Sequence, residues 1–313
     1  MTQISLFDGN EPLKIKKPIR LIELFAGIGA QAKALERLGV DFEHYRVCEF
    51  DKYAVRSYNA IHGTSFGVSD IRDWHGEDLG IEDTDKYEYI LTYSFPCQDL
   101  SLAGKQKGMT KGENTRSGLL WQVERLLNET EEKPQILLME NVPQVIGEKN
   151  IKDFAAWIKA LEQMGYHNYW QVLNAKDYGI PQNRARCFMV SCLEDAFYEF
   201  PKPQPLELRL KDLLEEHPDK KYYLSNVQVE GIINNAERRR ERGTFNVNFA
   251  PTEGGGQREA SPQSLIESQG ITLSHYATRI EKTNDIANTL MARDYKGYGN
   301  QPMNGVLEWN ANK

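Results

Sequence analysis

Short apolar runs alternate with longer amphipathic stretches up to about residue 200. The apolar runs predict buried strands, and the stretches with apolar residues at helical spacing predict helices. This alternation is typical of an α/β fold with a doubly wound, mostly parallel sheet. The expected strands are 19–25, 45–48, 66–71, 89–95, 136–139, 169–173 and 186–191, and the expected helices are 30–38, 52–61, 117–128 and 151–164.

The pattern changes at Phe200-Pro201-Lys202-Pro203-Gln204-Pro205, where three prolines at alternate positions predict an extended linker. Beyond it the sequence is irregular and has few periodic segments. We therefore expect three parts: an N-terminal arm at 1–18, a main domain at 19–200, and a smaller, irregular domain with long loops at 201–313.

Composition narrows the class of protein. The chain has 313 residues, 40% of them hydrophobic and 27% charged, as in an ordinary soluble globular protein. No apolar run is long enough to span a bilayer and no signal peptide is present, so we expect no membrane partner. The net charge of −7 does not exclude nucleic acid, because a local basic groove can bind it.

The four cysteines form no C-x-x-C pair and have no histidine partner at zinc spacing. We therefore expect no structural metal, and a reducing, cytoplasmic setting.

One cysteine has a distinctive position. Tyr89-Ile90-Leu91-Thr92-Tyr93-Ser94-Phe95 reads as a buried strand that Pro96 ends, and Cys97 follows at once. Ligands bind at the carboxyl ends of strands in open α/β sheets. A thiol at such a point is a candidate nucleophile, although a buried structural cysteine is the commoner case for a cysteine taken alone.

The first strand leads into a glycine turn. Gly27-Ile28-Gly29-Ala30-Gln31-Ala32 fits G-x-G-x-x-A, and Glu49 follows about 20 residues later, as expected for a carboxylate that binds a ribose diol. Phe50 and Asp70, also placed at strand ends, are candidates for stacking on an adenine and for contacting its amino group. The alternatives are a plain strand–helix turn, a site for NAD, and core or surface positions for Phe50 and Asp70.

These candidates share one edge of the predicted sheet. The glycine turn, Glu49, Asp70, Cys97 and Glu140 each fall where a buried strand stops. In a parallel sheet such points converge on one crevice. Packing alone does not readily explain five groups of this chemistry there.

With these residues placed, the sequence resembles the C5-cytosine DNA methyltransferases. The matching elements are Phe25-Ala26-Gly27-Ile28-Gly29, Phe95-Pro96-Cys97-Gln98, Glu140-Asn141-Val142 and Gln182-Asn183-Arg184-Ala185-Arg186, in the family's order and spacing. The resemblance covers roughly residues 21–191. It implies a Rossmann-like methyltransferase domain at 19–200, a target-recognition domain at 201–313, double-stranded DNA as substrate and S-adenosylmethionine as cofactor.

The resemblance also implies a role for each motif residue. Cys97 would add to C6 of a flipped-out cytosine, Glu140 would bond N3 and the exocyclic amine, and Arg184 and Arg186 would hold O2. The cofactor would be held by Phe25, Gly27, Ile28, Gly29, Glu49, Phe50, Asp70, Ile71, Pro96 and Leu120. DNA would be contacted by Gln98, Ser101, Lys105, Gln182 and Arg184.

The loop 105–116 is basic. It contains Gly108 and Gly112, and Gly104 lies directly before it. We interpret it as a closing loop that grips phosphates; a solvated basic loop is the alternative. The family's late helix and its Gly-Asn element are not found, because Gly299-Asn300 is followed by Gln301-Pro302 and by no helix that would finish the sheet. Three explanations are open: the remainder lies on a second polypeptide, the chain is truncated, or the ending is divergent. Of these, we expect a second polypeptide.

Three other functions stay open at this point. An RNA methyltransferase of the tRNA-directed branch would share the fold, but the long Arg-containing region after Pro205 suits a duplex better. A non-catalytic DNA-binding module would not need Cys97 and Glu140. An NAD oxidoreductase would need a hydride partner such as a catalytic histidine, and none of the six histidines stands at a predicted strand end.

Overall fold

The structure is a computed structural model that describes residues 12–100, 108–112 and 115–213. It also describes single positions and short stretches between 215 and 238, and 271–274, 279–282 and 287–288. Its internal contacts divide the chain into two compact units. The first comprises 1–173 and 185–202, and the second comprises 174–184 and 203–313. The assignment of the three sequence segments to an arm and two domains stays a prediction.

The first unit is built on a six-stranded sheet in the order β2-β1-β3-β4-β7-β5. The pairs β1–β2, β1–β3 and β3–β4 are parallel, and β4–β7 is antiparallel. The sheet is thus mostly parallel, as predicted. Its strands are β1 (Ile19–Leu24), β2 (Phe42–Cys48), β3 (Glu88–Tyr93), β4 (Ile136–Asn141), β5 (His167–Asn174) and β7 (Ala185–Cys192).

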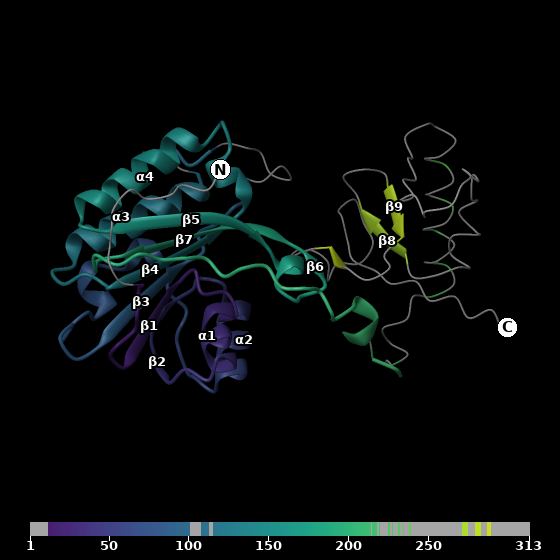
Figure 1. Cartoon of the computed structure of the whole chain (residues 1–313), viewed down its shortest axis with the longest axis horizontal. Coiled ribbons are helices and arrows are strands. Elements are labelled where there is room, and N and C mark those ends of the chain that lie inside the picture. The colour runs from purple at the N-terminus through teal and green to yellow at the C-terminus, as the bar shows by residue number, and fades with distance from the viewer. Residues whose placement is uncertain are drawn as a thin grey trace. The chain divides into compact units, whose positions relative to one another are not determined.

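Helices lie on both faces of this sheet. Figure 1 shows α1 and α2 beside β1 and β2, and α3 and α4 on the other side of the sheet. The four helices are α1 (Ala30–Arg37), α2 (Lys52–His62), α3 (Leu120–Glu129) and α4 (Ile151–Gln163). Local sequence sets their ends: Asp51 accepts hydrogen bonds from the backbone of Tyr53 and Ala54 at the start of α2, and Gly63 ends that helix in a left-handed conformation.

Strand β3 is buried along its whole length, as the continuous apolar run predicted. Its side chains alternate between two cores. Tyr89, Leu91 and Tyr93 belong to the larger core, which includes residues of α3 and α4, whereas Ile90 belongs to a smaller core with Ala32 of α1. This alternation confirms a sheet that is covered on both faces.

One expected strand is absent. Residues 64–70 form no regular element, and 71–73 form a 3₁₀ turn, η1 (Ile71–Asp73). The Asn59 side chain donates to the Phe66 carbonyl and accepts from its N–H, both at 2.9 Å. Because these backbone groups are paired with a side chain, the segment has less need of a sheet neighbour, and the prediction of a strand at 66–71 was wrong.

The described part of the second unit consists of short elements. They are η5 (Ala175–Asp177), β6 (Gln182–Asn183), η6 (Leu210–Leu213), β8 (Ile271–Ser274), β9 (Arg279–Lys282) and β10 (Ala287–Asn288). Strand β6 pairs with β10 in parallel, and β8 pairs with β9 antiparallel. No helix of the described residues is both long and apolar enough to cross a membrane.

The larger core predicts a stability effect at Trp157. This side chain is fully buried on α4, and its indole N–H donates to the Tyr93 hydroxyl at 3.1 Å. We expect Trp157→Ala to lower the free energy of unfolding by about 3–5 kcal/mol, as measured by urea denaturation. Ile151→Ala, at an exposed position of the same helix, should change it by less than about 0.5 kcal/mol. Equal effects of the two changes would contradict this packing.

Candidate active site

The glycine turn after β1 adopts the backbone conformations that its sequence allows. Gly27 and Gly29 have φ of 58° and 78°, and Phe25 has φ of 56° although it is not a glycine. Strained non-glycine residues of this kind concentrate at ligand sites. A Cβ on Gly29 would lie 2.4 Å from His62 Nε2, so the turn also needs a glycine there for packing.

Glu49 connects this turn to the end of β2. Its carboxylate accepts a hydrogen bond from the Gly27 N–H at 2.9 Å and another from the Asp51 N–H at 2.8 Å. The glycine turn and the residues after β2 are therefore held together by one nearly buried acidic side chain. The sequence placed Glu49 at this edge of the sheet, and the structure brings it to the turn.

The surroundings of the turn fit an adenosyl group. Phe50 is 69% exposed and Ile28 is 54% exposed, so both apolar side chains are accessible next to the Glu49 carboxylate. In doubly wound α/β folds a carboxylate at such a strand end accepts from ribose hydroxyls, and an exposed ring offers a flat surface for a base. Asp70 is paired with Arg72, whose guanidinium lowers the pKa of the Asp70 carboxyl.

Two of the residues expected to hold the cofactor have buried side chains. Ile71 and Leu120 are almost fully buried in the larger core, so only their main chains are candidates for ligand contact. Pro96 is half-buried in the loop after β3.

The loop that contains Cys97 is fixed by hydrogen bonds to three successive carbonyl groups. The Phe95 carbonyl accepts from the Asn141 side-chain amide at 2.9 Å, and the Pro96 carbonyl accepts from the Ser117 hydroxyl at 2.7 Å. The Cys97 carbonyl accepts from the Leu100 N–H at 3.0 Å. These contacts tie the loop to the end of β4 and to the turn that precedes α3.

The sequence motifs included Asn141 but gave no role to its side chain, and they did not include Ser117. Asn141 also accepts from the Val142 N–H at 2.8 Å, so it fixes both loops at once. The sequence feature that pointed to Asn141 is its position directly after Glu140 in the motif. For Ser117 the sequence gives no comparable signal.

Glu140 and Arg186 form an ion pair at this edge of the sheet. Arg186 Nε lies 3.0 Å from Glu140 Oε1, and the two side chains are 17% and 20% exposed. The strand register explains the pairing. Because β7 runs antiparallel to β4, its first residues lie beside the last residues of β4. Glu140 follows Met139, which pairs with Tyr93 at the end of β3, so the ion pair and the Cys97 loop leave neighbouring strands at the same edge.

The expected DNA contacts are only partly described. Ser101 and Lys105 lie outside the described residues. Gln98 is exposed, and its side-chain carbonyl accepts a hydrogen bond from the Arg116 guanidinium. The backbone N–H of Arg116 donates to the Asp99 carboxylate at 2.7 Å. The described base of the 105–116 loop is thus bound to the loop of Cys97.

Gln182 and Arg184 belong to the second unit. Gln182 is part of β6, and the Arg184 N–H donates to the Asn174 side chain at 2.9 Å. The structure therefore assigns the two arginines of the motif to different units, Arg184 to the second and Arg186 to the first.

The four cysteines differ in environment. Cys48, Cys187 and Cys192 are buried, and burial raises their thiol pKa to about 12, 12 and 11. Cys97 is half-buried in its loop. Since the thiolate is the nucleophile, the three buried cysteines are poorly reactive near neutral pH.

Comparison with known proteins gives a consistent result. The family model described as C-5 cytosine-specific DNA methylase matches residues 19–302. Type II methyltransferase M2.ScrFI of Lactococcus lactis subsp. cremoris is 33% identical over 259 residues, which cover 67% of this chain and 71% of that protein. Orphan methyltransferase M.SssI of Spiroplasma monobiae is 35% identical over 265 residues, covering 67% and 68%.

Solved structures share the fold. Entamoeba histolytica methyltransferase EhMeth has a TM-score of 0.57 and 19% identity, covering 74% of this chain and 68% of that one. The S. pombe Dnmt2 methyltransferase has a TM-score of 0.52 and 19% identity, covering 73% of this chain and 67% of that one. These likenesses confirm the predicted Rossmann-like methyltransferase fold.

The cysteine environments predict selective alkylation. We expect iodoacetamide at neutral pH to modify the native chain once, at Cys97, because the other three thiols are buried and their pKa values are raised. Intact mass and peptide mapping measure this, and the unfolded chain should take up four groups. Cys97→Ser should remain unmodified under the same conditions. Modification of a buried cysteine at a comparable rate would contradict the assignment.

Proposed function

Because the chain belongs to the C-5 cytosine-specific DNA methylase family, we propose that this DNA cytosine-5 methyltransferase uses Cys97 as its nucleophile. S-adenosylmethionine is the methyl donor and DNA is the substrate. The observation that supports the proposal most directly is the position of the Cys97 loop. It leaves β3 beside β4, whose end holds Glu140 in an ion pair with Arg186.

We propose that the glycine turn and the end of β2 hold the cofactor. Glu49 is placed to accept from the ribose hydroxyls, and the exposed Phe50 ring is available to stack on the adenine. Phe25, Gly27, Ile28 and Gly29 would provide the backbone surface against which it lies. When bound, S-adenosylmethionine supplies an electrophilic methyl group. Asp70 would have to exchange its contact with Arg72 for one with the adenine amino group.

The reaction needs a nucleophile such as Cys97 for a chemical reason. C5 of cytosine is a poor nucleophile, so a group must first add to C6 and turn the ring into an enamine. A thiolate is the side chain best suited to that addition. In this proposal Cys97 adds to C6, and it is released when the C5 proton has been lost after methyl transfer. The anchored carbonyls of Phe95, Pro96 and Cys97 hold the thiol in one place during both steps.

Glu140 and Arg186 act on the far side of the same ring. Addition at C6 places electron density on N3, and a carboxylic acid at Glu140 neutralises it by hydrogen bonding N3 and the exocyclic amine. The planar guanidinium of Arg186 is suited to hold O2, and Arg184 shares this role in the proposal. The existing Glu140–Arg186 pair aligns the two groups before the base arrives.

None of these contacts can form inside a stacked duplex, so the cytosine must be flipped out. We propose that Gln98, Ser101, Lys105 and Gln182 contact the DNA around the extruded base. The chemistry itself needs no metal ion. It does need a reduced thiol, which supports a cytoplasmic location for the protein.

The direct test is Cys97→Ser. We expect this variant to lose methyl transfer to duplex DNA by at least about 10³-fold, because an alcohol is a far weaker nucleophile than a thiolate. S-adenosylmethionine affinity by calorimetry and the melting temperature should stay at wild-type values, since the change is small and the thiol is not part of the cofactor surface. Labelled methyl transfer measures the activity.

Cys187→Ser is the matched control, because this cysteine is fully buried on β7 and has no role in the proposed chemistry. It should retain activity in the fraction that remains folded. Transfer to tRNA but not to duplex DNA by the wild-type chain would contradict the substrate assignment. Transfer at ordinary enzyme rates by the purified chain alone would disprove the expected second polypeptide.

A further inference from the structure

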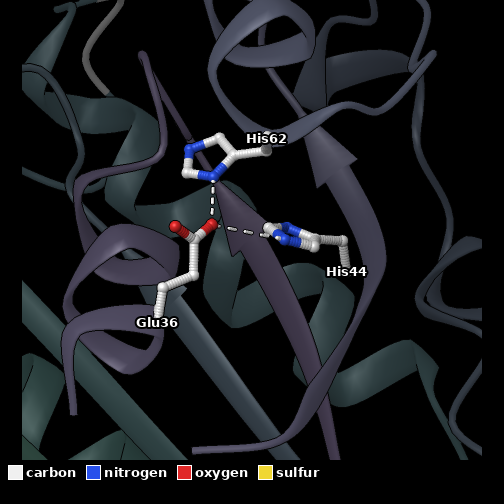
Figure 2. Close-up of side chains that lie close together, drawn as sticks. All are labelled: Glu36, His44 and His62. Atoms are coloured by element: carbon white, nitrogen blue, oxygen red, sulfur yellow. Dashed lines mark hydrogen bonds and ion pairs between the residues drawn. The ribbon is translucent and has the colours of Figure 1, made fainter. Parts of the chain in front are cut away.

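A cluster of two histidines and one carboxylate lies behind the glycine turn. Glu36 comes from α1, His44 from β2 and His62 from the end of α2, and Figure 2 shows the three side chains pointing toward one another. Glu36 Oε1 lies 2.7 Å from His62 Nδ1 and 3.9 Å from His44 Nε2. The three ligand atoms all lie within 4.8 Å of one another.

The hydrogen bonds of His62 define its tautomer. Its Nε2 lies 3.1 Å from the carbonyl oxygen of Ile28. A carbonyl can only accept, so Nε2 carries a proton. In neutral His62 the other nitrogen, Nδ1, therefore presents a lone pair to the Glu36 carboxylate, which also has only lone pairs to offer.

The tautomer of His44 follows from a buried relay. The Tyr58 hydroxyl donates its single proton to the Glu23 carboxylate at 2.5 Å and lies 2.8 Å from His44 Nδ1. While Glu23 is ionised that proton is used, and Nδ1 of His44 then donates to the Tyr58 oxygen. Burial raises the pKa of Glu23, and the hydrogen bonds from Tyr58 and Ala32 oppose that rise. His44 Nε2 is left with a lone pair directed at Glu36.

With His62 neutral and Glu23 ionised, three lone pairs thus face one region, and a cation between them would satisfy all three. A proton shared by His62 and Glu36 satisfies only one imidazole, because 3.9 Å from His44 Nε2 to Glu36 is too long for a hydrogen bond. A metal ion can be bound by all three. Two imidazoles and a carboxylate are a frequent ligand set for Zn²⁺.

The second contacts of both imidazoles match those of metal ligands. Histidines that bind metals usually donate their other N–H to a carboxylate, a backbone carbonyl or water. His62 does so to the Ile28 carbonyl, and His44 does so through Tyr58 to Glu23. We propose that Glu36, His44 and His62 form a binding site for one divalent transition-metal ion of the zinc class.

The position of this site suits an ion that stabilises the fold. It joins α1, β2 and α2, and His62 also holds the Ile28 carbonyl of the glycine turn. A bound ion would therefore fix the underside of that turn and take no part in methyl transfer. Lys33 Nζ lies 2.6 Å from Glu36 Oε2, so the other carboxylate oxygen, Oε1, is the one that would bind the metal. The inference departs from the expectation of no metal, which rested on cysteine and histidine spacing along the sequence.

The test uses the full chain after removal of metals with a chelator. Co²⁺ serves as the spectroscopic probe, and Zn²⁺ affinity is measured by competition with a chromogenic chelator. We expect one equivalent of Co²⁺ with tetrahedral d–d bands and no thiolate charge-transfer band. His44→Gln should weaken Zn²⁺ binding by more than about 100-fold, since loss of a partner beyond the ligands already costs about 10–100-fold.

Tyr58→Phe removes the hydroxyl that contacts both His44 and Glu23, so it tests the support of His44 while leaving all three ligands in place, with folding checked by circular dichroism. It should weaken Zn²⁺ binding by about 10–100-fold. Glu36→Gln, at a partly exposed position, provides a ligand change that should leave the fold intact. His75→Gln is the matched control, because His75 faces Glu129 at 3.8 Å on the surface and, among the described residues, belongs to no three-ligand cluster. This variant should bind Zn²⁺ as the wild type does.

Three results would overturn the proposal. The first is no Zn²⁺ binding up to millimolar concentrations by the wild-type chain. The second is a thiolate charge-transfer band, which would assign the ion to a cysteine. The third is unchanged affinity in folded His44→Gln and Glu36→Gln, with folding checked by circular dichroism.

Discussion

The site depends on how the chain is held just after β3. Three consecutive carbonyls, those of Phe95, Pro96 and Cys97, each accept a hydrogen bond, the first two from distant segments of the chain and the third from within the same loop. Each such hydrogen bond contributes only about 1 kcal/mol to stability, but an unpaired buried carbonyl would cost more. Together they leave the backbone around Cys97 little freedom, so that the position of the thiol follows from the fold.

The same edge of the sheet brings the other residues of the proposed site together through strand register. Parallel pairing of β3 with β4 places Glu140 beside the Cys97 loop, and antiparallel pairing of β4 with β7 brings Arg186 to Glu140. A shift by one residue would turn these side chains to the other face. The geometry of the proposed site therefore follows from the geometry of the sheet, and both depend on buried apolar strands.

The sequence predicted the parts of the fold that depend on apolar periodicity. The apolar runs at 45–48, 89–95 and 136–139 correspond to β2, β3 and β4, and the positions of Glu49, Cys97 and Glu140 near the ends of these strands followed from them. The strand predicted at 66–71 does not form. The Asn59 side chain pairs with the backbone N–H and carbonyl of Phe66, and the apolar periodicity of the sequence does not reveal such a contact. The roles of Asn141 and Ser117 were also hidden, since both act through contacts between distant segments. Glu36, His44 and His62 are far apart in sequence and match no ligand spacing, so only the fold brings them together.

The most direct measurement uses duplex DNA in which every cytosine is replaced by 5-fluorocytosine. Fluorine at C5 cannot leave as a proton does, so an enzyme that adds through C6 stays bound to the base after methyl transfer. Incubation with S-adenosylmethionine followed by peptide mass mapping should give one DNA adduct, on Cys97. An adduct on another residue, or methylation of ordinary DNA with no adduct on the fluorinated duplex, would contradict the account.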